Sequence, residues 1–119
     1  MKKGYNSQLL DYLDNGDGTL KLLNYGYPTE DVEPCHWIVK CWERHLKDLE
    51  KSNSSDFPYY FSPERARSVI QFFDFLRCAH GTMNGRPCAG QPIRLLEWQM
   101  MIFWIVYGWL EKETDFRRF

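Results

Sequence analysis

Cysteine and histidine side chains form the most obvious candidate chemical site in this sequence. They are Cys35, His36, Cys41, His45, Cys78, His80 and Cys88. Thiolate sulfur and imidazole nitrogen are preferred zinc ligands, and four of them make a closed tetrahedral site. However, the sequence has no Cys-x-x-Cys pair, and Cys41 and His45 fall on the apolar face of a predicted helix. Zinc binding therefore remains an alternative interpretation.

The four cysteines also bear on the compartment. The first residues carry no apolar signal-peptide core, so we expect a cytoplasmic chain with free thiols. Two disulfides would require an oxidising compartment, for which the sequence shows no address.

Arginine side chains form a second candidate set, for contacts with nucleic-acid phosphates. They are Arg65, Arg67, Arg77, Arg86, Arg94, Arg117 and Arg118. The chain as a whole balances 15 Lys and Arg against 16 Asp and Glu, which gives no global attraction to a polyanion. DNA binding by a local basic surface remains an alternative, and a steep salt dependence would be its signature.

A nucleotide-phosphate loop and a nuclease centre are both missing from the sequence. The pattern G-x-x-x-x-G-K-[ST] cradles phosphates with backbone N–H groups, a lysine and a Mg²⁺-binding hydroxyl, and no glycine here begins it. No apolar strand ends in an acidic pair, and no carboxylate cluster suits a two-metal nuclease. We therefore expect this chain alone neither to hydrolyse ATP nor to cut DNA.

The elements that would position these residues are mainly helical. With 119 residues and 44% hydrophobic residues, the chain has the size and composition of one globular domain or part of one. Apolar periodicity predicts helices over 34–51, 63–80 and 95–111. Ser62-Pro63-Glu64 is typical of a helix N-terminus, and Gly81 is placed to end the second helix.

The first 33 residues carry a weaker pattern. We expect residues 1–33 to form an irregular N-terminal arm around the turn-forming pairs Asn15-Gly16 and Asp17-Gly18, where a hairpin or two short helical pieces would both fit. The longest apolar run, 100–107, is far too short to cross a membrane, so we expect no membrane association.

The third predicted helix is apolar on all sides. Only Glu97, Gln99 and Gly108 interrupt the apolar run from Leu95 to Leu110. Two amphipathic helices are barely enough to cover such a helix. The last four residues alternate as a strand does, and a strand without a partner is not stable. We therefore expect the polypeptide to continue, and this chain alone to be poorly soluble or dependent on a partner.

An ordered set of short motifs carries a resemblance to a known family. The set is Cys41-Trp42-Glu43-Arg44-His45-Leu46-Lys47-Asp48-Leu49, Tyr60-Phe61 with Ala66, His80-Gly81, Ala89-Gly90-Gln91-Pro92-Ile93, Leu95-x-x-Trp98-Gln99, Tyr107-Gly108-Trp109 and Arg117-Arg118-Phe119. In this order and spacing, the set resembles the N-terminal segment of the large terminase subunit of tailed bacteriophages and prophages. The resemblance covers about residues 35–119.

The resemblance implies a DNA-packaging motor. Large terminase subunits join a P-loop ATPase, which uses ATP and Mg²⁺ to drive viral DNA into a capsid, to a metal-dependent endonuclease. It implies the terminase small subunit, the portal and viral DNA as partners, in the cytoplasm of a bacterial host cell. The fold class it implies is mainly α: a three-helix segment over 34–119 with a short C-terminal strand stub, an incomplete part of an α/β P-loop ATPase domain that stops before the Walker A loop.

Trp98 and Gln99 are the site residues that the resemblance implies. In related motor ATPases a glutamine upstream of the Walker A loop reads the adenine edge, because an amide can both accept from the exocyclic amine and donate to N7. Trp98 would stack or pack beside it in the complete protein. Alternatively, Trp98 is a core anchor and Gln99 caps the helix. A further alternative for the whole chain is a small helical accessory or interaction protein.

Overall fold

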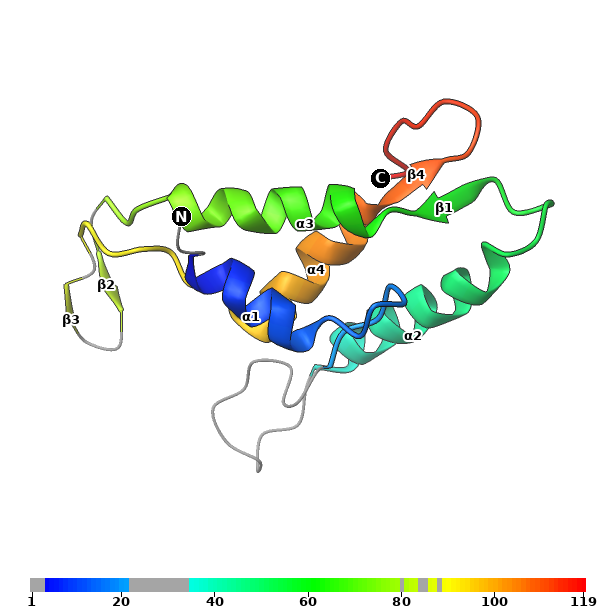
Figure 1. Cartoon of the computed structure of the whole chain (residues 1–119). Helices are drawn as coiled ribbons and strands as arrows, with labels where there is room; N and C mark the ends of the chain where they lie inside the picture. The colour runs from blue at the N-terminus through cyan, green and yellow to red at the C-terminus, as the bar shows by residue number, and fades with distance from the viewer. Residues whose placement is uncertain (1–3, 22–34, 80, 84–85, 88) are drawn as a thin grey trace.

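The computed structural model describes residues 4–21, 35–79, 81–83, 86–87 and 89–119, and in this part of the chain the fold is mainly helical (Figure 1). The predicted mainly helical class is confirmed. The helices are α1 (Tyr5–Leu13), α2 (His36–Lys51), α3 (Pro63–Phe72) and α4 (Glu97–Gly108), with one 3₁₀ turn at Phe73–Phe75. The strands are β1 (Tyr59–Phe61), β2 (Thr82–Met83), β3 (Arg86–Pro87) and β4 (Trp109–Glu111).

Helix α4 forms the centre of the core and packs most extensively against α3. Its buried side is formed by Met100, Met101, Trp104 and Ile105, while Ile102, Phe103, Val106 and Tyr107 on the other side are only half-buried. The helix is therefore not enclosed on all sides by the described residues. None of the described helices is long and apolar enough to span a lipid bilayer.

Part of the segment expected to be an irregular arm is a core element. Residues 5–13 form helix α1, and Leu10, Leu13 and Leu20 are buried in the same cluster as the side chains of α4. The turn that follows α1 closes through an antiparallel bridge between Asp14 and Leu20. Residues 1–3 and 22–34 of the predicted arm lie outside the described residues.

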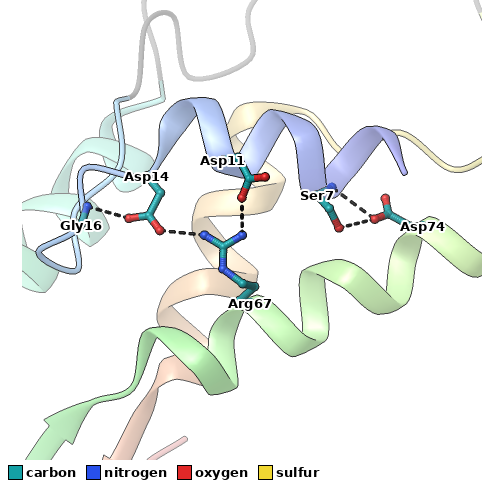
Figure 2. A network of polar contacts seen from close by, with 6 residues as sticks. All are labelled: Ser7, Asp11, Asp14, Gly16, Arg67 and Asp74. Atoms are coloured by element: carbon teal, nitrogen blue, oxygen red, sulfur yellow. Dashed lines mark hydrogen bonds and ion pairs between the residues drawn. The ribbon is translucent and has the colours of Figure 1, made fainter. Parts of the chain in front are cut away.

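Two charged side chains, Arg67 and Asp74, fasten α1 to the α3 segment, as Figure 2 shows. Arg67 of α3 donates to Asp11 over 2.6 Å and to Asp14 over 2.8 Å. The Asp74 carboxylate, just beyond α3, accepts from the backbone N–H groups of Asn6 and Ser7 and from the Ser7 hydroxyl. Because the first N–H groups of a helix have no partner within it, a carboxylate there satisfies them and complements the helix dipole.

The predicted helix over 63–80 is too long. Its start is correct, with Ser62 Oγ accepting from the Arg65 N–H, but regular α-helix ends at Phe72 and the 3₁₀ turn at Phe75. Leu76, the next residue, is extended, and Arg77 bridges to Pro92. Gly81 therefore does not cap this helix. Asp74, within the 3₁₀ turn, lies at the N-terminus of α1, which no pattern within residues 63–80 could indicate.

The C-terminal segment has a strand partner within the chain, which corrects the expectation of an unpaired strand. Strand β4 pairs antiparallel with β1, with Tyr60 opposite Leu110, and on its other side Leu110 forms an antiparallel bridge to Arg117. The Arg118 N–H donates to the Trp109 carbonyl over 3.0 Å. Residues 109–111, assigned by sequence to the end of a helix, supply the missing partner.

Candidate functional site

The candidate nucleotide residues, Trp98 and Gln99, lie in the first turn of α4. The Gln99 amide oxygen accepts from the Leu96 N–H over 2.9 Å, and both side chains are half-buried. Gln99 therefore caps the start of α4, as the structural alternative expected. This hydrogen bond also fixes the orientation of the Gln99 amide. The amide oxygen has a second lone pair, so it can still accept a hydrogen bond from another donor.

A buried histidine joins three distant parts of the chain near the other end of α4. His45 is 1% exposed; its Nε2 lies 2.8 Å from the Gly18 carbonyl, and its Nδ1 lies 3.0 Å from Trp109 Nε1. An indole nitrogen can only donate, so Nδ1 accepts and the Nε2–H donates to Gly18. The neutral imidazole is thus held as a single tautomer. Trp104 Nε1 donates to the same Gly18 carbonyl over 3.0 Å.

Aromatic rings enclose this histidine. The rings of Phe61 and Trp109 lie 4.9 and 5.8 Å from the His45 ring in edge-on arrangements, and the Phe61 ring lies 5.3 Å from that of Trp104. We call His45, Phe61, Trp104 and Trp109 the His45 cluster. Desolvation by this environment lowers the pKa of His45, and the hydrogen bond to Gly18 and the charge of Asp48 only partly offset it.

We expect the free energy of unfolding to fall as the pH falls below about 6.5, by at most about 1.4 kcal/mol per pH unit. In the unfolded chain His45 takes up a proton near pH 6.5, whereas its lowered pKa keeps it neutral in the fold. Below about pH 6.5 the unfolded state therefore binds more protons than the folded state. The stability that is present above that pH is lost as the pH falls toward the lowered pKa of His45 in the fold. Urea unfolding between about pH 7.5 and 5 measures the effect. His45→Gln should flatten the dependence, and the exposed His36→Gln should not; equal slopes in both variants would contradict the assignment.

The Tyr107-Gly108-Trp109 motif has a steric basis. A Cβ atom on Gly108 would lie 2.2 Å from Phe61 Cε2 and 2.6 Å from Phe61 Cζ. Gly108 ends α4, and its carbonyl accepts from the Ser62 N–H over 2.7 Å. The missing side chain lets β1 approach the end of α4, and the chain then turns directly into β4.

The Arg117-Arg118-Phe119 motif separates into an exposed and a buried arginine. Arg117 lies over the Tyr107 ring, at 5.3 Å from its centre. The Arg118 guanidinium donates to Asp48 of α2 over 2.8 Å and lies 4.4 Å from the centre of the Tyr59 ring. The side chains of Arg118 and Asp48 are only 12% and 8% exposed. Arg118 thus attaches the C-terminal segment to α2.

The arginines considered for DNA contact do not form one surface in the described residues. Arg67 is occupied by Asp11 and Asp14, Arg94 lies 4.9 Å from the centre of the Tyr5 ring, and Arg118 is paired with Asp48. The exposed Arg65 and Arg117 border a shallow hollow beside the C-terminal turn. The side chain of Arg86 lies outside the described part of the chain.

The cysteine and histidine side chains considered for zinc binding have different environments in the structure. Cys78 is disulfide-bonded, contrary to the expectation of free thiols, whereas Cys35 and Cys41 are free. Both nitrogens of His45 are used in hydrogen bonds, and burial raises the pKa of the Cys41 thiol. Among the described residues, no group of three Cys, His, Asp or Glu side chains is arranged to hold a metal ion. His80 and Cys88 lie outside the described residues.

Two carboxylates with structural roles were not identified from the sequence. Asp48 is a charged residue of the amphipathic helix α2, yet it is only 6% exposed. Asp74 was placed within a helix, where its contact with α1 could not be foreseen. Each acts on a segment more than 60 residues away, and a local pattern carries no signal for such a contact.

Comparisons of the chain with protein-family models, with curated proteins and with solved structures find no match. The assignment of a function therefore rests on the residues and geometry described above.

Proposed function

We propose that this chain is the N-terminal segment of a large terminase subunit, whose complete form is an ATP-driven viral DNA-packaging motor and endonuclease. One observation carries the proposal: four of the motifs that resemble that family, those at residues 41–49, 60–61, 107–109 and 117–119, meet around His45. His45, Phe61 and Trp109 are in mutual ring contact, and Arg118 contacts Asp48 beside them. Residues that define a shared fold would be expected to meet in this way.

The Trp98-Gln99 pair is proposed to lie beside the adenine of ATP in the complete protein. The hydrogen bond from the Leu96 N–H orients the Gln99 amide at the start of α4, and half-burial leaves part of both side chains accessible. An oriented amide can recognise an adenine edge with less loss of side-chain entropy than a mobile one. This chain alone is proposed to be catalytically inactive, and ATP and Mg²⁺ are cofactors of the complete protein.

A polypeptide that carries this segment followed by a Walker A loop tests the proposal directly. We expect Gln99→Ala to weaken ATP binding about tenfold, because one bidentate base contact contributes about 1–3 kcal/mol of discrimination. The affinity for GTP should change much less. Gln91→Ala, which truncates an exposed glutamine, is the matched control. Unchanged ATP affinity and base preference in Gln99→Ala would refute the adenine role.

A small helical accessory or interaction protein is the second candidate. Exposed apolar side chains favour it: Phe72 is 58% exposed, Phe75 75% and Leu96 48%. The pairing of the C-terminal segment with β4 is also compatible with it. The coding sequence that follows Phe119 separates the two candidates, because the motor proposal requires a strand and a Walker A loop there and the accessory proposal does not.

A further inference from the structure

One face of helix α2 carries only aromatic and basic side chains. Trp37, Lys40, Arg44, Lys47 and Lys51 follow one another at steps of three or four residues, which places them within an arc of about 80° along about 21 Å of helix. We call these five residues the α2 stripe. Trp37 is 72% exposed, and the four cations are exposed as well. The opposite face, with Trp42 and His45, is buried in the core, so the stripe faces outward.

The α2 stripe borders a groove of about 440 Å³ between α2 and the C-terminal segment. Lys40, Arg44, Lys47, Lys51 and Arg118 line it, together with two carboxylates, Glu43 and Asp48. Asp48 is already paired with Arg118. Among the described residues, neither Lys47 nor Lys51 forms an ion pair. With five cationic side chains against two carboxylates, the lining of the groove is positive, although the formal net charge of the chain is −1.

Exposed aromatic rings accompany these cations. Lys40 Nζ lies 5.9 Å from the centre of the Trp37 ring, and Arg44 lies 5.8 Å from the centre of the Phe119 ring, which is 51% exposed. A row of cations can bind the phosphates of a nucleic acid, and exposed aromatic rings beside it can stack on the bases. A row of solvated lysines without such rings could do only the first. The combination of cations and exposed rings is typical of surfaces that bind single-stranded nucleic acid.

We propose that the α2 stripe binds single-stranded nucleic acid, with its lysines and arginine along the phosphates and Trp37 stacked on an unpaired base. A duplex keeps its base faces covered, so Trp37 would have nothing to stack on. An anionic membrane is a poorer match, because the apolar face that an interfacial helix would insert is buried here against Trp104 and Trp109. The inference does not depend on the terminase proposal.

Fluorescence anisotropy with the full chain and a labelled single strand of about 15 nucleotides tests the proposal, at about 50 to 200 mM salt. Each phosphate contact contributes about 0.7 to the salt slope for single strands, so Lys47→Ala with Lys51→Ala should lower the slope by about 1.4. Trp37→Leu should weaken binding at least about fivefold through lost stacking. Arg65→Ala with Arg77→Ala removes the same charge elsewhere and should leave both quantities unchanged.

Thermal unfolding of each variant verifies that the exposed substitutions leave the fold intact. A measurable affinity at low salt, with losses confined to the stripe variants, would support the proposal. It would be overturned by absent binding at about 50 mM salt, by equal losses in the control variant, or by duplex or anionic vesicles binding as tightly as the single strand. Full affinity in Trp37→Leu would overturn the stacking and, with it, the single-strand assignment.

Discussion

Arg118→Met is expected to lower the free energy of unfolding by about 1–4 kcal/mol, between the values for an exposed ion pair and for removing one partner of a fully buried one. Among the described residues, the substitution leaves the Asp48 carboxylate, which is 6% exposed, with Arg44 Nε at 3.8 Å as its remaining ion-pair partner. It also removes the cation from the ring faces of Tyr59 and Phe119, which lie 4.4 and 5.1 Å away. Chemical denaturation monitored by tryptophan fluorescence measures the change.

Arg117→Met is the matched control for this substitution. The neighbouring arginine is exposed, and its described contact is with the Tyr107 ring at 5.3 Å, so the expected loss is below about 1 kcal/mol. In a second arm, Asp48→Leu combined with Arg118→Met should recover most of the lost stability, since apolar side chains of similar volume can replace a buried pair. Equal losses for Arg117→Met and Arg118→Met would contradict the buried role of Arg118.

This contrast between adjacent arginines shows where a sequence pattern stops being informative. Both were expected to lead a strand onward with no partner in the chain. Their alternation does indicate extended structure, and the structure gives Arg117 a bridge to Leu110. The partner strand, however, follows α4 directly, and its first two residues, Trp109 and Leu110, continue the apolar run of the helix after Gly108. Helical periodicity could not reveal the transition, because it depends on contacts with β1.

The helices were predictable where local signals determine them. Helix α2 was expected over 34–51 and occupies His36–Lys51, and α3 begins at Pro63 as the Ser62-Pro63-Glu64 signal indicated. Asp74, just past the early end of α3, accepts from the first turn of α1, and its partners are 67 and 68 residues away. Local sequence patterns therefore predicted individual helices, but not the residues that join distant segments of the fold and of the candidate site.

Gly108 is another such residue, and it gives a sharp test of the packing at the end of α4. Without a neighbour, Gly108→Ala should stabilise a helix by about 0.5–1 kcal/mol, because alanine has the higher helix propensity. In this chain the added Cβ would lie 2.2 Å from Phe61 Cε2. We therefore expect a net loss of about 1–3 kcal/mol, the usual cost of overpacking. Urea unfolding of Gly108→Ala against the parent chain measures it.

A double-mutant cycle with Phe61 identifies the cause of that loss. Phe61→Leu removes Cε2 and Cζ, the two atoms that an added Cβ would meet first. In the Phe61→Leu background, Gly108→Ala should cost less than about 1 kcal/mol, because directly contacting residues show strong non-additivity. Gly16→Ala is not a suitable control, since the φ of +87° at Gly16 adds backbone strain of its own. Additive losses from Gly108→Ala and Phe61→Leu would mean that the glycine is needed for another reason, and that the close approach of β1 to α4 does not determine this position.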